Sequence, residues 1–320
     1  QLSCDKIMSD VFKNPPPAFS NDYVFDIIKK HFDISPSLTP LVSDRDQNFK
    51  ITEGEKSHIF KIANSAESRS VLEMQNSALS YISKKDDSIE IPQPVKTIDG
   101  HDILSIEIKN TKYHARLLTY VDGVFLKDVK PTNGTTFTVG KFLGYLDKGL
   151  VGFDHRAAKR EFIWDVSQVS LLESNLTKDD FDLITFFINS FKHDISSLMN
   201  DFPKTIIHND GNDHNILVDS YNRVKGIIDF GDMIHSYRVI EPSVAMAYIA
   251  IEDNNFELIA SLIKGYHSIV PLSMDELKAA IYFMCLRMCV SITMSAKRKI
   301  LFPENKYISI SEEKARKFLI

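Results

Sequence analysis

Hydrophobic and polar residues alternate in short segments between residues 40 and 123. A period of two residues is typical of half-buried β-strands, and a Glu53-Gly54-Glu55 turn joins the first two segments as a β-hairpin. The strand segments predicted in this way are 40–54, 57–64, 92–99, 102–110 and 113–123. Together they predict a small sheet in the first part of the chain.

Two stretches of this first part have helical spacing instead. Residues 20–32 begin with Ser20, a good helix cap, and then repeat apolar residues every three or four positions. Residues 65–85 show the same spacing and end on two lysines, which stabilise the carboxyl end of a helix. A leading helix and one helix inserted between the strands are therefore expected.

The remainder of the chain is predominantly helical in pattern, most clearly over residues 136–153, 179–202 and 241–320. We predict an α+β, bilobal protein-kinase-like fold. Its small mixed β-sheet lobe, with the leading helix, spans residues 1–118 and binds the nucleotide. Its larger, mainly helical lobe spans residues 119–320 and carries the catalytic loop and the substrate site.

The composition favours a protein that binds small molecules. With 43% hydrophobic residues the 320-residue chain can bury a substantial core, and 38 basic against 43 acidic residues give a net charge of −5, which opposes nucleic-acid binding. No apolar run is expected to span a bilayer, and the first ten residues lack an apolar secretory core. Because three cysteines suit a reducing compartment, a cytoplasmic location is expected.

Residues 206–233 concentrate the candidate chemistry. His208, Asp210 and Asn215 form an H-x-D-x-x-x-x-N pattern, and Asp229 opens a D-F-G triplet after an apolar run. Phosphoryl transfer to a hydroxyl requires a carboxylate near the attacking oxygen, with an amide oxygen and a second carboxylate to hold Mg²⁺ on the nucleotide phosphates. The pattern therefore indicates a kinase, in which we expect His208 to support the loop by hydrogen bonding.

Two other interpretations of this stretch are weaker. Asp, Asn and Gly are common turn formers, so the loop taken alone could be an ordinary surface turn. The order of loop, apolar strand, turn, second apolar strand and D-F-G favours the catalytic interpretation. A calcium loop of the EF-hand type needs Gly and Glu at its sixth and twelfth positions, which here hold Asn215 and Tyr221 counted from Asp210.

The first lobe offers candidate phosphate-binding residues. Lys61 lies on a predicted strand between apolar neighbours, and Glu73 lies in the following helix, which is the order of the lysine and its glutamate partner in kinase lobes. A solvated lysine and a solvated glutamate are the alternative. No G-x-G-x-x-G is found near the start of the chain, so a polar turn with Ser43, Gln47 and Asn48 is expected to contact the phosphates, unless it is a simple hairpin turn.

Eight strings along the chain carry a more specific resemblance. They are LVSDRDQNF, HIFKIAN, EMQN, RLLTYVDG, REFIWDVSQVSLLE, HNDGNDHNIL, IIDFGDM and LFPENK. Together they resemble the hydroxylysine kinase family of the aminoglycoside phosphotransferase (kinase-like) superfamily, from Pro36 to Lys306. The catalytic loop supports the superfamily, and the peripheral strings support the narrower family.

The resemblance implies GTP-dependent phosphorylation of the side-chain hydroxyl of 5-hydroxy-L-lysine with Mg²⁺, with ATP as the other possible donor. It makes Asp210 the catalytic base, Asn215 and Asp229 the metal ligands, Lys61 the phosphate lysine and Glu73 its partner.

The chain departs from the family pattern beside the proposed base. Similar sequences usually have H-G-D-L, whereas here Asn209 and Gly211 flank Asp210. The loss of an apolar anchor at Gly211 is expected to loosen the loop. Asn209 places a Cβ in a tight turn, although asparagine tolerates left-handed conformations better than most residues. The two changes could therefore reduce activity, although no catalytic atom is missing.

An amino-acid substrate with two ammonium groups and one carboxylate requires acidic residues and one basic residue near the acceptor. The acidic candidates near the catalytic motifs are Asp213, Asp232, Glu241 and Asp165. Trp164, the only tryptophan, is expected either to stack on a cation or to anchor the core. Arg287 interrupts an apolar helix and needs an anion, which is either the substrate carboxylate or a glutamate on a helix.

Competing functions remain at this point. Ethanolamine, choline, homoserine or an aminoglycoside could replace hydroxylysine as the acceptor, because the shape of the pocket decides between them. A nucleotide-binding pseudokinase would require a substitution among Lys61, Asp210, Asn215 and Asp229, and all four are intact. The expected partners are a nucleoside triphosphate and a small amino alcohol or amino acid, with neither nucleic acid nor a membrane.

Overall fold

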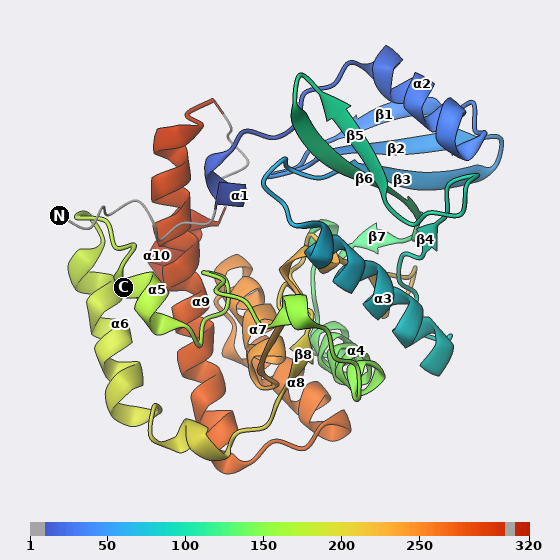
Figure 1. Cartoon of the computed structure of the whole chain (residues 1–320). Helices are drawn as coiled ribbons and strands as arrows, with labels where there is room; N and C mark the ends of the chain where they lie inside the picture. The colour runs from blue at the N-terminus through green and yellow to red at the C-terminus, as the bar shows by residue number, and fades with distance from the viewer. Residues whose placement is uncertain (1–9, 305–310) are drawn as a thin grey trace. The chain divides into compact units, whose positions relative to one another are not determined.

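The computed structural model describes residues 10–304 and 311–320, so most of the first ten residues and the end of the LFPENK string lie outside the described part. The described chain forms two compact units (Figure 1). The smaller unit contains residues 10–80 and 91–121, and the larger contains the rest. The inclusion of residues 81–90 in the larger unit is a feature that the sequence pattern did not indicate.

The smaller unit is built on a six-stranded sheet with the order β1-β2-β3-β6-β4, in which β5 also pairs with β6 (Figure 1). Its strands are β1 Ser37–Leu41, β2 Gln47–Glu53, β3 Lys56–Ile62, β4 Pro94–Val95, β5 Leu104–Ile108 and β6 Thr111–Thr119. Every pairing is antiparallel. The hairpin predicted at Gly54 joins β2 to β3, and Gly54 takes a φ of +59°, which glycine adopts without strain. The polar turn expected at the phosphates separates β1 from β2.

Helix α2 (Asn21–Phe32) covers the sheet with the residues that the pattern predicted. The Oγ of Ser20 accepts a hydrogen bond from the N–H of Tyr23 at 3.3 Å and caps the helix. Val24 and Ile28 are fully buried in one core with Phe49 and Phe60 of the sheet. Full burial of each such side chain contributes about 1.5–3 kcal/mol, which explains why this short leading helix is ordered.

A polar contact links the predicted inserted helix, α3 (Arg69–Lys85), to the sheet. The guanidinium of Arg116 on β6 is 3% exposed and donates to Oε1 of Gln75 at 2.7 Å and to Oδ1 of Asn76 at 2.9 Å. Buried polar groups of this kind require partners. The link therefore fixes α3 beside Lys61, which lies opposite Arg116 in the sheet.

The larger unit is mainly helical, as predicted. Its helices are α4 Asn133–Leu150, α5 Val169–Glu173, α6 Phe181–Asp194, α7 Ile240–Glu252, α8 Phe256–Ile269, α9 Met274–Leu301 and α10 Glu312–Leu319, and α1 Asp10–Lys13 belongs to the smaller unit. Helices α4 and α8 approach closely because two glycines line their contact. A Cβ on Gly140 would lie 1.9 Å from the carbonyl oxygen of Leu262, and one on Gly265 would lie 2.1 Å from that of Phe137. No larger residue fits at either position.

Helix α9 corrects the expectation that no apolar run is long enough to span a bilayer. It has 28 residues and is long and apolar enough, by length and composition, to cross a membrane. However, 72% of its apolar window is buried inside the protein, which is typical of a core helix. A capping box between Ser273 and Glu276 begins the helix. Cys285 and Cys289 on it are free thiols, and Cys289 is buried in the core.

Two small sheets of the larger unit hold the catalytic motif. β8 (Lys204–Ile207) pairs with β11 (Ile234–Tyr237), and β9 (Ile216–Val218) lies between β10 (Val224–Ile227) and β7 (Val124–Phe125). The catalytic loop connects β8 to β9, and the D-F-G triplet follows β10 and enters the 3₁₀ turn Phe230–Asp232. The sequence predicted β9 and β10 but not the β8–β11 pair. Other 3₁₀ turns are Leu126–Asp128, Arg156–Ala158 and Leu198–Asp201.

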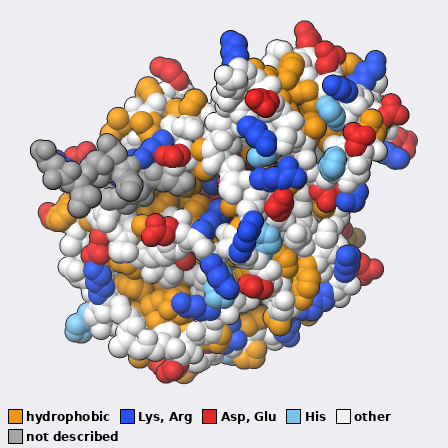
Figure 2. Space-filling view, viewed as in Figure 1, with side chains coloured by type: hydrophobic (Ala, Val, Ile, Leu, Met, Phe, Trp, Pro, Cys, Tyr) orange, Lys and Arg blue, Asp and Glu red, His pale blue; other side chains and the backbone are white. Residues whose placement is uncertain are grey.

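Acidic and basic side chains are interspersed over the face drawn in Figure 2. A mixture of this kind is typical of a solvated protein surface.

Candidate active site

A buried carboxylate of α7 anchors the catalytic loop. Oε2 of Glu241 accepts hydrogen bonds from the backbone N–H groups of His208 at 2.6 Å and Asn209 at 3.1 Å. Glu241 is 0% exposed, and burial raises its pKa to about 7, although the two backbone amides act to lower it. The expectation that Glu241 contacts the substrate is therefore wrong, because this side chain is sealed inside the protein and holds the loop.

His208 crosslinks the two catalytic motifs. Its Nδ1 accepts a hydrogen bond from the backbone N–H of Asp210 at 3.2 Å, and its Nε2–H donates to the carbonyl oxygen of Ile228 at 3.1 Å. An N–H can only donate and a carbonyl can only accept, so these partners define a neutral ring with its proton on Nε2. Burial lowers the pKa of His208 to about 4, which keeps the ring neutral. This geometry supports the loop-supporting role predicted for His208.

The two residues that depart from the family pattern are both accommodated. Asn209 takes a φ of +64°, and its Nδ2 donates to the carbonyl oxygens of Trp164 at 3.2 Å and Asp232 at 3.3 Å. Gly211 packs against Leu143, where a Cβ would approach to 3.1 Å. The loop is therefore tied to its surroundings at Asn209 and closely packed at Gly211, which argues against the loosening expected from the sequence.

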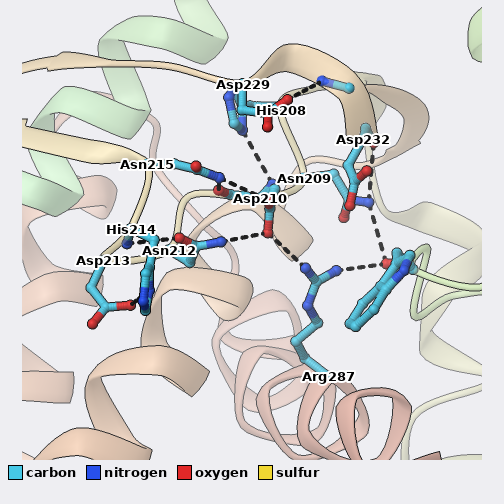
Figure 3. Close-up of polar contacts among 12 residues, drawn as sticks. His208, Asn209, Asp210, Asn212, Asp213, His214, Asn215, Asp229, Asp232 and Arg287 are labelled. Atoms are coloured by element: carbon cyan, nitrogen blue, oxygen red, sulfur yellow. Dashed lines mark hydrogen bonds and ion pairs between the residues drawn. The ribbon is translucent and has the colours of Figure 1, made fainter. Parts of the chain in front are cut away.

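Three donors hold the carboxylate of Asp210 (Figure 3). Its Oδ1 accepts from Nδ2 of Asn212 and from Nη2 of Arg287, both at 2.9 Å, and its Oδ2 accepts from Nδ2 of Asn215 at 2.8 Å. A carboxylate has about four acceptor positions, so one on Oδ2 remains. The side chain is 19% exposed, which leaves the carboxylate within reach of a ligand.

The electrostatic surroundings of Asp210 suit a proton acceptor. Burial and the nearby negative charge of Asp232 raise its pKa to about 8, while Arg287 acts in the opposite direction. Once ionised, a carboxylate with a raised pKa accepts a proton more readily than an ordinary aspartate, and the charge of Arg287 favours the ionised form. This is the property required for removing a proton from an alcohol.

Asn215 and Asp229 lie side by side and offer oxygen atoms to a cation. The backbone N–H of Ile228 donates to the carbonyl oxygen of Asn215 at 3.0 Å, which places the following Asp229 next to Asn215. Nδ2 of Asn215 donates to Asp210 at both Oδ2 and the carbonyl oxygen, so the amide oxygen is the atom left for a metal ion. An amide oxygen and a carboxylate fit Mg²⁺, which completes its shell with water and phosphate. Accordingly, the described residues contain no cage of three or more His, Cys, Asp or Glu side chains.

The turn that carries Asp229 is held from two sides. Asp229 takes a φ of +62°, and its Oδ1 accepts from the N–H of Gly231 at 3.3 Å. The ring of Phe230 meets the His208 ring edge-on, with centroids 4.6 Å apart. Nη2 of Arg160 donates to the carbonyl oxygen of Gly231 at 2.9 Å. These contacts fix a left-handed residue in place, a conformation that non-glycine residues adopt only when their surroundings enforce it.

The buried Arg287 lies against the half-buried ring of Trp164, beside Asp210. The guanidinium carbon of Arg287 lies 4.4 Å from the centre of the Trp164 ring, and the side chain is almost completely buried. The sequence left open whether the anion beside Arg287 is a substrate carboxylate or a helix glutamate. In this structure the anion is Asp210. The cation expected on Trp164 is Arg287 itself.

Asp165 is also excluded as a substrate contact. Its Oδ1 accepts from the hydroxyls of Ser167 and Ser236, each at 2.8 Å, and its Oδ2 accepts from Nε2 of Gln168 at 3.0 Å. The residue is 3% exposed. Both oxygens are therefore used to hold its own loop against β11.

Asp213 and Asp232 remain as acidic candidates. Asp213 is 7% exposed and its Oδ1 lies 3.1 Å from Nδ1 of His214. Asp232 is 6% exposed, and its charge acts on both Asp210 and Arg287. Of the two, Asp232 is the one whose charge raises the pKa of the proposed base.

The nucleotide-binding candidates lie in the smaller unit. Lys61 is on β3, opposite Asn48 of β2 and Arg116 of β6. Glu73, its expected partner, forms an exposed ion pair with Arg69 one helical turn away, at 2.9 Å. The strand position of Lys61 and the helical position of Glu73 are as predicted.

The turn between β1 and β2 is held by its own side chains. Oε1 of Gln47 accepts from the N–H of Phe19 at 2.9 Å, and its Nε2 donates to the carbonyl oxygen of Phe19 at 2.8 Å. These bonds tie the turn to Phe19 and use one of the two Nε2–H donors, so a phosphate contact by Gln47 stays a prediction. Ser43 accepts from the N–H of Asp46 at 3.3 Å, which is a turn contact. Oδ1 of Asn48 is buried without a hydrogen-bond partner among the described residues.

Sequence reasoning missed three residues of the site. They are Asn212, which holds Asp210; Arg160, which holds the D-F-G turn; and Tyr248 of α7, whose ring centre lies 5.8 Å from the guanidinium carbon of Arg287. Arg160 lies in one of the strings that carried the family resemblance, so that string was its signal. No local pattern distinguishes Tyr248, because its role depends on how α7 meets α9.

Comparison with known proteins extends this picture. The model of the phosphotransferase enzyme family matches residues 37–277. The hydroxylysine kinases of Mus musculus and Xenopus laevis are 28% and 31% identical to this chain, and the alignments cover 95% and 96% of it and 89% and 90% of the relatives.

Solved structures share the fold at low sequence identity. A microcompartment-associated aminopropanol kinase has a TM-score of 0.76 at 17% identity and covers 93% of this chain and 95% of its own. An amicoumacin kinase in complex with AMP-PNP and Ca²⁺ has a TM-score of 0.74 at 15% identity, covering 94% and 93%. The predicted kinase-like α+β fold is thereby confirmed. The chain belongs to the phosphotransferase enzyme family, as a small-molecule kinase related to the hydroxylysine kinases that transfers a phosphoryl group to an alcohol.

Proposed function

We propose that this kinase phosphorylates the side-chain hydroxyl of 5-hydroxy-L-lysine, with Mg²⁺ and with GTP or ATP as the donor. Similarity to hydroxylysine kinases along nearly the whole chain supports this choice of acceptor. The observation that carries the catalytic assignment is the carboxylate of Asp210, held by three donors with one acceptor position left on Oδ2.

In the proposed reaction the acceptor hydroxyl oxygen bonds to the γ-phosphorus, and the bond from that phosphorus to the β-phosphate oxygen breaks. The nucleoside diphosphate leaves, and the hydroxyl proton passes to Oδ2 of Asp210. Asn215 and Asp229 would hold the Mg²⁺, which when bound neutralises phosphate charge. The neutral ring of His208 links the backbone N–H of Asp210 to the carbonyl oxygen of Ile228, just before the D-F-G triplet.

The smaller unit supplies the nucleotide site in this proposal. Lys61 provides a positive charge for the α- and β-phosphates, and Glu73 is its proposed partner. Ser43 and Asn48 flank the phosphates with the turn between β1 and β2, whose backbone N–H groups can contact phosphate oxygens. The preference for GTP rests on the resemblance to the hydroxylysine kinase family.

The charges near the base favour a cationic acceptor. The negative charges of Asp232 and Asp229 raise the pKa of Asp210, whereas the positive charge of Arg287 lowers it. The excess of negative charge favours a divalent cation and an ammonium group over a neutral alcohol. Asp232 and Asp213 are the proposed ammonium partners. The free thiols on α9 agree with the proposed cytoplasmic location.

A product-mass screen tests the proposal. The protein is incubated with Mg²⁺ and either GTP or ATP, and with 5-hydroxylysine, lysine, ethanolamine, choline, homoserine or an aminoglycoside. Hydroxylysine should gain one phosphoryl group, and lysine, which lacks the hydroxyl, should not. Equal efficiency with ethanolamine would replace the proposal by a general amino-alcohol kinase. Phosphorylation of an aminoglycoside alone would replace it by a resistance-type kinase.

A further inference from the structure

A closed ring of hydrogen bonds links the proposed base, Asp210, to Arg287, Trp164 and Asn209. Nη2 of Arg287 donates to Oδ1 of Asp210 at 2.9 Å, and Nη1 donates to the carbonyl oxygen of Trp164 at 3.1 Å. The same carbonyl oxygen accepts from Nδ2 of Asn209 at 3.2 Å. The covalent bond between Asn209 and Asp210 completes the ring. Figure 3 shows the guanidinium of Arg287 directed at Asp210 from the opposite side to the metal-binding candidates.

Burial and aromatic packing leave this hydrogen-bonded ring little freedom to move. The side chain of Arg287 is 2% exposed, so its charge requires an anion, and separating it from Asp210 would leave a buried unpaired charge. The Trp164 ring covers the guanidinium at 4.4 Å, and Tyr248 lies 5.8 Å from the guanidinium carbon. A planar guanidinium held by two donated bonds and an aromatic face has little freedom to rotate.

The ring distinguishes the two oxygens of the base. Arg287 and Asn212 occupy Oδ1, whereas Oδ2 carries only the bond from Asn215. A rotation of the carboxylate would break the ion pair with Arg287. Oδ2 is therefore held in one orientation, on the side of Asn215 where the metal and phosphates are proposed to bind.

We propose that Arg287 and Asn209 are positioning residues, which act through the Trp164 carbonyl to hold Asp210 with Oδ2 directed at the acceptor hydroxyl. Arg287 is then not the ligand of a substrate carboxylate. Asn209, the departure from the usual glycine, is part of the catalytic support. The inference rests on the proposed role of Asp210 as base, but not on which alcohol is the acceptor.

The experiment compares kcat and KM for Arg287→Ala, Arg287→Lys, Asn209→Gly and the Arg287→Ala/Asn209→Gly double variant. Arg298→Lys is the control, because Arg298 is also buried on α9 but lies outside the ring. Arg287→Ala should lower kcat about 100-fold, the effect expected of a misplaced catalytic group, with KM for nucleotide and acceptor changed less than about threefold. Asn209→Gly should lower kcat about tenfold, but much less in the Arg287→Ala background, since both act on one ring.

Chemical rescue separates positioning from folding. Millimolar guanidinium chloride should restore part of the kcat of Arg287→Ala, whereas sodium chloride at equal ionic strength should not. Failure of rescue, with a loss of thermal stability that accounts for the lost activity, would overturn the inference. Full activity of Arg287→Lys would also overturn it, because the single nitrogen of a lysine cannot occupy the positions of both Nη1 and Nη2.

A substrate-carboxylate role gives a different result. The variants are also measured with 2-hydroxy-1,5-diaminopentane, which is hydroxylysine without its carboxylate. A raised KM for hydroxylysine alone in Arg287→Ala would assign Arg287 to the substrate and overturn the inference. If the parent protein favours another alcohol, the proposed acceptor fails, and the same variants measured on that alcohol decide the positioning role.

Discussion

The backbone N–H of His208 donates to Oε2 of Glu241 at 2.6 Å, across 33 residues of sequence. The same oxygen holds the next residue of the loop, so a single buried carboxylate sets the path of the chain just before the base. The other oxygen, Oε1, has no hydrogen-bond partner among the described residues. Oδ1 of the buried Asp147 also has none there. The two carboxyl groups interact, and burial together with Glu241 raises the pKa of Asp147 well above its ordinary value.

These buried carboxyls predict a pH dependence of stability. The pKa of Glu241 rises from 4.5 to about 7 on folding, mainly through burial. The folded state therefore binds more protons than the unfolded state between these values, and stability must fall as pH rises through this window, by at most about 3 kcal/mol from this group. Glu241→Gln, which cannot ionise, should lose less stability than the parent between pH 5 and pH 8. Thermal unfolding across this range measures it, and parallel curves for both proteins would contradict the assignment.

Asp210→Asn should abolish turnover while leaving nucleotide affinity nearly unchanged. The amide cannot accept the hydroxyl proton, and loss of a general base lowers the rate by about 10²- to 10⁴-fold. Asn212→Ala is a useful comparison, because it removes one donor to Oδ1 but keeps the carboxylate. Calorimetric titration with nucleotide and Mg²⁺ provides the binding measurement. A collapse of nucleotide affinity together with kcat would show that Asp210 holds metal or structure instead.

Asp229→Ala and Asn215→Ala should weaken nucleotide binding in a way that depends on Mg²⁺. Both would remove an oxygen ligand, whereas Lys61→Ala removes a point charge and should weaken binding with or without the metal. Nucleotide titrations at several Mg²⁺ concentrations distinguish the two behaviours. Identical Mg²⁺ dependence for all three variants would refute the division of roles.

Asp232→Asn should raise KM for hydroxylysine more than for ethanolamine. A dicationic substrate loses more than a monocationic one when a carboxylate is removed from a partly dry site. Asp213→Asn provides the matched comparison, since both residues are similarly buried. Steady-state kinetics with both acceptors measures the ratio. An unchanged ratio in both variants would exclude these carboxylates from ammonium binding.

Gly140→Ala should destabilise the larger unit, whereas Gly134→Ala on the same helix should not. A Cβ at Gly140 would meet the backbone of Leu262 at 1.9 Å, while the nearest contact at Gly134 is the flexible Thr132 hydroxyl at 3.6 Å. Overpacking costs about 1–3 kcal/mol or more, and replacing an unconstrained helical glycine by alanine gains about 0.5–1 kcal/mol. Differential scanning calorimetry should therefore show opposite shifts of Tm. Equal shifts would mean that α4 and α8 are not in close contact.

Features that depend on neighbouring residues were predictable from the sequence. The Ser20 cap, the turn at Gly54 and the spacing of Asp210, Asn215 and Asp229 are local, because a helix cap, a hairpin or a strand–loop–strand unit is specified within a few residues of chain. The apolar periods also predicted the core face of α2, since each side chain follows the helical repeat.

The contacts of charged side chains were decided by the tertiary structure alone. Arg287 meets Asp210 across 77 residues, and the sequence showed only that this arginine needed an anion. Glu241 looked like a substrate contact because it lies soon after the D-F-G triplet, but the packing of α7 buries it under the loop. Which charges pair, and which reach solvent, depends on how separate helices pack around the loop. That packing is a sum of many weak contacts between residues distant in sequence, so no local pattern encodes it.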